Sequence, residues 1–208
     1  MHTTGLVLYN GADEIEICGT FDVLTSIRTV DSGRWTNDPA FSVSLLGETL
    51  DPITTSHGLS IRPNTKLSDN GKYDVIVIPG GPGARLQKYP DSLLGWLKTN
   101  ACNSQYIVSL TTGAFILARA GLLKNRRVAT YPGFVADIKR IEPSCSVTGD
   151  ERVALDNANL FSSSGIAGAI EVSIALVERM EGFRSAEIAA KRISWPCIID
   201  DFVPVYSS

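Results

Sequence analysis

The chain has 208 residues, with 19 lysines and arginines against 22 aspartates and glutamates and a formal net charge of −3. Because this balance is mildly acidic and the basic residues are scattered, we expect neither nucleic acid nor an anionic membrane as a partner. The length predicts a single domain over residues 1–208, large enough to bury a substantial core.

The sequence also indicates where the protein resides. No apolar run approaches the roughly 20 residues of a membrane span, and the first residues lack the basic start and longer apolar region of a signal peptide. The four cysteines are widely spaced and form no C-x-x-C pair, which indicates reduced thiols: Cys18, Cys102, Cys145 and Cys197. We therefore expect a cytoplasmic protein without disulfides, a zinc site or another metal.

Strand-like and helix-like segments alternate along the chain. Apolar runs predict strands at Leu6–Tyr9, Phe41–Leu46, within Tyr73–Gly81, at Tyr106–Leu110 and at Arg127–Tyr131. Helical patterns cover Glu14 to about Thr29, Asp91–Ala101, Ile166–Met180 and Ala186–Arg192. Hairpins are predicted within Thr49–Arg62 and in RVALDNANLFSSSG, with the turn of the latter at Asp156-Asn157. This order predicts an α/β fold with a mostly parallel sheet that is covered on both faces.

The most informative segment is YIVSLTTGAFILARAGLL, which spans Tyr106–Leu123. An apolar strand meets the small residues Thr111 to Ala114 and continues as a helix, which is the geometry of a nucleophile elbow. Such an elbow lifts the side chain of Thr111 above the edge of the sheet, beside N–H groups at a helix N-terminus. A β-branched residue with positive φ is strained, so Thr111 either tolerates that strain or relaxes the elbow.

Polar residues and glycines follow several of the predicted strands. Ligands of open α/β sheets bind beyond the carboxyl ends of the strands, so we expect these segments to converge. The first strand leads to Glu16, and the later strands end in PGGPG, TTG and YPG. The predicted site therefore holds a carboxylate, two hydroxyls, a phenol and glycine N–H donors: Glu16, Thr111, Thr112, Tyr131, Gly80, Gly81 and Gly113.

Four motifs in order, VIVIPGGPG, SLTTGAFILARAGLL, RVATYPG and LFSSSGIAGAIEVSIALVERMEG, resemble those of the ThiJ/PfpI superfamily. Within this superfamily, which shares the class I glutamine amidotransferase-like fold, the chain is most similar to isonitrile hydratase-type members. The resemblance runs from Leu6 to about Gly182. It implies a flavodoxin-like three-layer α/β sandwich and a homodimer with its active sites near the subunit interface. The predicted final segment, SWPCIIDDFVPVYSS, would pack irregularly on the body or on the partner.

The resemblance also implies roles for individual residues. Thr111 occupies the position of the elbow cysteine, and Tyr131 that of a histidine found in many relatives. Glu16 matches the acidic residue of the first helix, which is usually aspartate in isonitrile hydratases. Thr112 matches the threonine after the nucleophile, and Gly80 and Gly81 match the glycines of the oxyanion hole.

The difference between cysteine and threonine changes the chemistry that is available. A thiol can be tuned to a thiolate near neutral pH, whereas an aliphatic hydroxyl needs an adjacent base. Only two histidines exist, the terminal His2 and His57, which we place in a hairpin away from the strand ends. We therefore interpret Thr111 as a polar wall of a pocket rather than as a covalent nucleophile.

Glu16 is then the main catalytic candidate, although a carboxylate in the first turn of a helix is also favourable when it is merely solvated. Under apolar cover its pKa would rise, which would suit a general acid or base near neutral pH. We expect its neighbours Asp13 and Glu14 to face solvent and Cys18 to be a small core residue.

Three functions follow from these residues. The first is a hydratase-like lyase or cyclase that acts on a small neutral molecule through Glu16, without a cofactor or covalent intermediate. The second is a non-catalytic protein that binds or senses a small molecule and has lost the nucleophile. The third, a cysteine-dependent glyoxalase, deglycase or peptidase, is disfavoured because the elbow has no thiol.

Overall fold

The computed structural model describes residues 1–31, 34–69, 71–156 and 158–195. Its strands are β1 (His2–Val7), β2 (Arg28–Asp31), β3 (Arg34–Pro39), β4 (Phe41–Gly47), β5 (Ile53–Thr54), β6 (Ser60–Ile61), β7 (Thr65–Lys66), β8 (Val75–Ile78), β9 (Tyr106–Leu110), β10 (Arg127–Ala129), β11 (Ser146–Thr148), β12 (Val153–Leu155) and β13 (Leu160–Ser163). Its α-helices are α1 (Glu14–Ser26), α2 (Pro82–Arg85), α3 (Asp91–Asn100), α4 (Ala114–Arg119), α5 (Val135–Ile141), α6 (Gly168–Glu181) and α7 (Phe183–Arg192).

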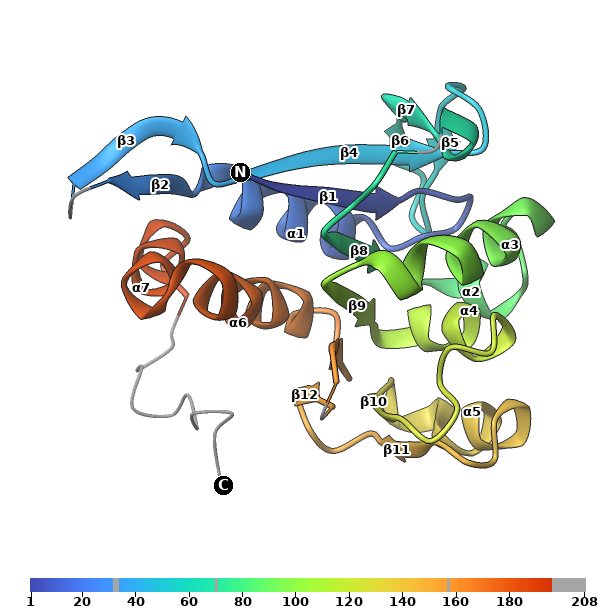
Figure 1. The fold of residues 1–208 in the computed structure, drawn as a ribbon. Coiled ribbons are helices and arrows are strands. Elements are labelled where there is room, and N and C mark those ends of the chain that lie inside the picture. The colour runs from blue at the N-terminus through green and yellow to red at the C-terminus, as the bar shows by residue number, and fades with distance from the viewer. Residues whose placement is uncertain (32–33, 70, 157, 196–208) are drawn as a thin grey trace.

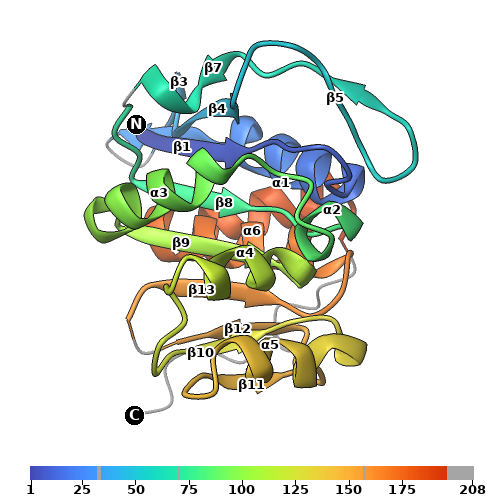
Figure 2. The same cartoon turned by 90° about the vertical axis from the view of Figure 1, so that its right-hand side faces the viewer.

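The main sheet has seven strands in the order β12-β13-β9-β8-β1-β4-β7. All neighbouring pairs are parallel except β12 with β13. Helices α1, α6 and α7 cover one face, and α2, α3, α4 and α5 lie on the other (Figures 1 and 2). The structure therefore confirms the predicted three-layer α/β sandwich with a mostly parallel sheet.

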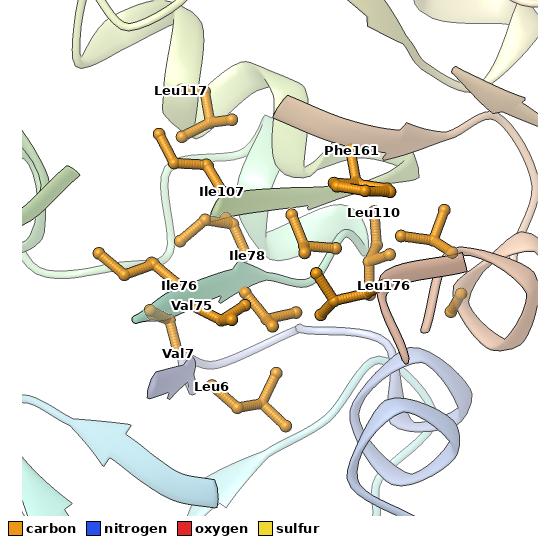
Figure 3. Packing of buried hydrophobic residues seen from close by; sticks show 14 of the residues in the cluster. Leu6, Val7, Val75, Ile76, Ile78, Ile107, Leu110, Leu117, Phe161 and Leu176 are labelled. Carbon is orange, nitrogen blue, oxygen red and sulfur yellow. The ribbon is translucent and has the colours of Figure 1, made fainter. Parts of the chain in front are cut away.

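The central strands form the core because both of their faces are covered by helices. All four residues of β8, the run VIVI, are fully buried. Ile107 and Leu110 of the neighbouring strand β9 pack with them, together with Phe161 of β13 and Leu176 of α6 (Figure 3). A continuous apolar run without alternation is the expected pattern of a parallel strand that is buried on both faces.

The order of the strands fixes where the functional residues meet. Strand β1 is central, and the chain passes from it to β4 on one side and later to β8 on the other. In such sheets the point where the strand order reverses leaves a crevice beyond the carboxyl ends of the strands. The loops that follow β1, β8 and β9 carry Glu16, Gly80 and Thr111, respectively, to this end of the sheet.

Several boundaries and elements differ from the predictions. The first strand is His2–Val7 rather than Leu6–Tyr9, because its whole length pairs with β4. The first helix ends at Ser26 rather than near Thr29, and the predicted strand Arg127–Tyr131 ends at Ala129 and pairs with β11 in a separate two-stranded sheet. The prediction missed β2, β3, β7, β11, α2 and α5, which are short or, like β3, largely exposed and without apolar periodicity.

The C-terminal part agrees more closely with the predictions. The hairpin of β12 and β13 is antiparallel and turns after Asp156, while Asn157 lies outside the described residues. Helices α6 and α7 begin at Gly168 and Phe183, near the expected positions. Most of the predicted irregular tail, residues 196–208, lies outside the described residues. Within the part that the structure describes, no helix combines the length and apolarity needed to cross a bilayer.

Candidate active site

The position of Glu16 follows from how α1 begins. The carboxylate of Asp13 caps the helix by accepting hydrogen bonds from the N–H groups of Ile15, at 3.0 Å, and Glu16, at 3.3 Å. Asp13 is therefore buried, and the prediction that it faces solvent was wrong because its carboxylate serves as the N-cap. Glu16 lies in the first turn, pointing inward, with 0% of the residue exposed.

The carboxyl group of Glu16 has a partner for each oxygen. Its Oε2 accepts a hydrogen bond from the N–H of Gly80 at 2.5 Å, and its Oε1 lies 2.7 Å from the hydroxyl of Thr111. Burial raises the pKa of Glu16 to about 8, although these two hydrogen bonds lower it. Since the pKa exceeds 7, the protonated acid predominates at neutral pH.

Thr111 keeps the strained backbone of an elbow. It has a φ of 39°, in the left-handed region that β-branched residues rarely adopt. A 3-10 turn over Thr111–Gly113 connects β9 to α4, with Gly113 packed closely against the carbonyl of Ile78. The hydroxyl of Thr130, just beyond β10, donates to the carbonyl of Thr111 at 2.9 Å. Thr111 is 4% exposed, so the surrounding structure holds the residue in place.

The loop after β8 supplies two glycines. Gly81 has a φ of 109°, and its N–H donates to the hydroxyl oxygen of Thr112 at 2.9 Å. The hydroxyl of Thr112 donates in return to the carbonyl of Gly81 at 3.0 Å. Because the N–H of Gly80 is bonded to Glu16, both glycine N–H groups have acceptors within the protein. An oxyanion would have to compete with these acceptors.

Two residues that hold this site were not among the predicted site residues. The phenol of Tyr9 is buried and donates to the carbonyls of Pro79 and Gly80, which fixes the loop that follows β8. Burial is the main cause that raises the pKa of Tyr9 well above its usual range, and the nearby Glu16 raises this pKa further. Thr130 could have been found from its place at a strand end, whereas nothing in the sequence distinguishes Tyr9 from an ordinary core residue.

Tyr131 lies further out than the other predicted site residues. It follows Thr130 directly, but half of the residue is exposed. Its ring is tilted by 44° against that of Phe134, with the centroids 5.8 Å apart. The structure therefore brings Glu16, Gly80 and Thr111 into direct contact, and places Tyr131 at the surface beyond the elbow.

Strands β5 and β6 confirm the hairpin predicted within Thr49–Arg62, but the side chain of His57 in its turn reaches the start of α1. His57 Nδ1 lies 2.8 Å from Glu14 Oε1, and the hydroxyl of Ser56 donates to Glu14 Oε2 at 2.8 Å. His57 thus lies over the start of α1 rather than away from the strand ends. Although slight desolvation raises the pKa of Glu14, hydrogen bonds lower it to about 2. The carboxylates of Asp13 and Glu14 approach His57, and hydrogen bonds within the protein already use both of them.

Two further predictions need correction. Cys18 is exposed rather than buried, because it lies on the outer face of α1, two residues beyond Glu16. Its pKa is raised by partial desolvation and by the nearby Glu14, which does not favour a thiolate. The run Ser162-Ser163-Ser164 before α6 has the composition of a helix N-cap and predicts one there, but the N-cap residue of α6 is Ala167, without a side-chain hydrogen bond.

A family model for the DJ-1/PfpI family matches residues 4–179 of the chain. The chain belongs to the DJ-1/PfpI family. A solved THiJ/PfpI family protein from Pseudomonas syringae superposes with a TM-score of 0.79 at 20% identity, covering 94% of this chain and 76% of that one. This likeness agrees with the sandwich architecture described above.

Relatives within the DJ-1/PfpI family carry different names. An isonitrile hydratase from Pseudomonas putida is 27% identical over 191 residues, covering 92% of this chain and 77% of the relative. A glutathione-independent glyoxalase, DJR-1.2 from Caenorhabditis elegans, is 31% identical, covering 82% and 84%, respectively. The HTH-type transcriptional regulator CdhR of Pseudomonas aeruginosa is 27% identical, covering 63% of this chain and 38% of the regulator. Family membership alone therefore leaves the reaction open.

The raised pKa of Glu16 predicts how stability depends on pH. An unfolded glutamate releases its proton near pH 4.5, whereas folded Glu16 keeps it to about pH 8. The contribution of Glu16 to the free energy of unfolding is therefore complete below pH 4.5 and is lost as the pH rises through about 8. Relative to Glu16→Gln, we expect the wild type to lose on the order of 3–5 kcal/mol over this range. Urea unfolding at several pH values gives the free energy of unfolding of both proteins. The prediction would be rejected if this free energy changed equally with pH in the wild type and in Glu16→Gln.

Proposed function

We propose that this protein is a small-molecule hydratase of the isonitrile hydratase type, which uses Glu16 as a general acid and base and needs no cysteine nucleophile. The observation that carries this proposal is the fully buried carboxyl group of Glu16, which lies 2.7 Å from the hydroxyl of Thr111 and whose pKa burial raises to about 8. A general acid works best when its pKa lies near the working pH, and such groups typically accelerate reactions by about 10²–10⁴-fold.

Thr111 provides the path for the proton. Since Oε2 of Glu16 accepts the N–H of Gly80, the proton of the neutral acid belongs on Oε1, which faces Thr111. The Thr111 oxygen then accepts this proton as a hydrogen bond, and its own hydroxyl proton is available to a substrate. Glu16 has no exposed surface, so a substrate would meet Thr111 first. The hydroxyl is a relay in this scheme and forms no bond to carbon.

Hydration of an isonitrile fits this arrangement. Thr111 gives its proton to the terminal carbon of the substrate while Glu16 reprotonates Thr111, which leaves a nitrilium ion and a carboxylate. The oxygen of a water molecule then bonds to the nitrilium carbon, and a proton of that water returns through Thr111 to Glu16. The resulting imidic acid tautomerises to the N-substituted formamide. The two residues end as they began, and no electrons are gained or lost.

A second function, binding or sensing of a small molecule without turnover, is favoured by a different observation. Both carboxyl oxygens of Glu16 and the N–H groups of Gly80 and Gly81 already have partners within the protein. No oxyanion donor is therefore free at these glycines. A regulator among the relatives fits this alternative as well.

Turnover of a simple isonitrile to its formamide tests the proposal and separates the two functions. We expect purified wild-type protein to convert phenyl isocyanide to formanilide, detected by chromatography, without any added thiol or metal. Thr111→Cys serves as the comparison, because it restores the side chain expected from the family resemblance. If Thr111→Cys is active and the wild type is inert, the hydratase proposal fails and the binding function is favoured.

We also propose that the protein acts as a homodimer of single-domain subunits in the cytoplasm, with a small molecule as its ligand. Support for the dimer comes from the family resemblance, and α1 also exposes the apolar side chains of Ile15 by 54% and Phe21 by 36%. We expect light scattering to give twice the mass of one chain, and a monomer at micromolar concentration would contradict the dimer.

A further inference from the structure

An exposed arginine near the elbow stacks on an aromatic ring and has no hydrogen-bond or ion-pair partner for its side chain among the described residues. Arg85 ends α2, and its guanidinium carbon lies 5.1 Å from the centroid of the Phe134 ring. Stacking of this kind uses the face of the guanidinium and leaves its N–H donors free in the plane. Among the residues that the structure describes, no side chain or carbonyl accepts a hydrogen bond from these donors, and no carboxylate pairs with them.

Aromatic rings continue from Arg85 in two directions. The ring of Phe134 meets Phe115 edge-on, with the centroids 5.8 Å apart and an interplanar angle of 73°. On its other side it contacts the half-exposed ring of Tyr131. Phe115 is buried and has the guanidinium carbon of Arg119 5.3 Å from its ring centroid, so it supports Phe134 from behind. The four residues Arg85, Phe115, Phe134 and Tyr131, here called the aromatic shelf, thus combine the partly exposed rings of Phe134 and Tyr131 with the exposed charge of Arg85.

The elements that carry the aromatic shelf also hold the candidate active site. Arg85 lies one helical turn beyond Gly81, and α2 packs against the turn that contains Thr111. Phe115 belongs to the helix that this turn begins. Tyr131 follows Thr130, whose hydroxyl is bonded to the carbonyl of Thr111. Three separate segments therefore place the shelf beside the elbow at Thr111, on the side of the sheet that carries α2, α4 and α5 (Figure 2).

We infer that the aromatic shelf binds the substituent of the substrate, and that the substrate is an aryl isonitrile bearing a carboxylate. This inference rests on the proposed hydratase function. The planar fork of a guanidinium matches a carboxylate through two parallel hydrogen bonds, and aromatic faces accept a planar ring. A neutral aliphatic isonitrile would use neither feature.

Comparison of two isonitriles that differ only in the carboxylate tests the inference. The measured quantity is the ratio of kcat/KM for para-isocyanobenzoate to that for phenyl isocyanide. We expect this ratio to exceed one in the wild type and to fall about 10- to 100-fold in Arg85→Ala, chiefly through KM. Arg85→Lys keeps the charge but loses the fork, and should recover only part of the preference. The matched control is Arg140→Ala, an exposed arginine of α5, which should leave the ratio unchanged.

A binding measurement separates failure of the inference from failure of the proposed function. The ligands are the corresponding formamides, para-formamidobenzoate and formanilide, titrated calorimetrically into the wild type and Arg85→Ala. If neither isonitrile is hydrated, the proposed function fails, while tighter and Arg85-dependent binding of para-formamidobenzoate would still support the shelf. Equal binding of the two formamides by the wild type would overturn the inference, as would an equal loss of preference in Arg140→Ala.

Discussion

Replacing Glu16 with glutamine is expected to lower turnover of phenyl isocyanide by at least about 10²-fold while the protein remains folded. Glutamine has nearly the same shape and can still accept the N–H of Gly80, so the packing around this position is preserved. It has no ionisable proton, and the relay through Thr111 loses both its source and its final acceptor. Steady-state kinetics give the effect on turnover, and circular dichroism reports whether the fold is retained.

The neighbouring carboxylate provides the matched control for this experiment. Glu14 lies on the same helix, and its pKa is lowered to about 2 by hydrogen bonds that oppose slight desolvation. Glu14→Gln should therefore keep full turnover. In the wild type, kcat/KM should fall as the pH rises through about 8, because the protonated form of Glu16 is lost. Unchanged turnover in Glu16→Gln would remove this residue from the mechanism.

The second large effect is expected for Gly80→Ala. A Cβ atom built at this position would lie 2.0 Å from the hydroxyl oxygen of Thr111 and 2.8 Å from both the carbonyl of Leu110 and the N–H nitrogen of Thr112. Two of these three atoms are backbone, so rotation of one side chain cannot relieve the overlap. We expect turnover to fall to background, and the free energy of unfolding to decrease by roughly 1–3 kcal/mol, as in other overpacked sites.

Gly95→Ala is the control for a glycine replacement at a place with room. Gly95 lies within α3, and no atom would approach its Cβ within 4 Å. Alanine is the better helix former, so this variant should gain about 0.5–1 kcal/mol and keep its turnover. Chemical denaturation measures both variants on the same scale. A Gly80→Ala protein that was as stable and as active as the wild type would show that the elbow and the glycine loop are not in close contact.

The sequence was sufficient to predict the layers of the fold and the meeting of three loops. A short β-branched run such as Val75–Ile78, closed by Pro-Gly-Gly, predicts a buried strand. The TTG corner at Thr111 lies between an apolar strand and a helix, which predicts a sharp turn there. The prediction failed where local patterns carry little information. Short elements such as α2 and the exposed ribbon of β2 and β3 have no apolar period, so nothing marks them in the sequence.

Side-chain environments were harder to predict than the elements. Asp13 is buried and Cys18 is exposed, the reverse of what was expected. The cap made by Asp13 is local to the first turn, whereas the face of α1 that is buried depends on elements distant in the sequence, such as α6. His57 could not be placed either, since only the tertiary fold brings its loop over the first turn of α1. The contact of Glu16 with Thr111 joins residues 95 positions apart; the strand ends predicted that their loops converge, and the family resemblance implied that the two side chains act together.

The way the main sheet ends limits how copies of this protein can associate. Its two outermost strands are very short: β12 has three residues and β7 has two. Open strand edges invite a second chain to add its own strand, and short edges reduce that risk. Addition of a strand is thus disfavoured at β12. At the other end, β7 pairs with only Leu46 and Gly47 of the seven-residue strand β4. If copies of this chain share a sheet, the part of β4 before Leu46 is therefore the edge that a second chain would meet, and β12 is not.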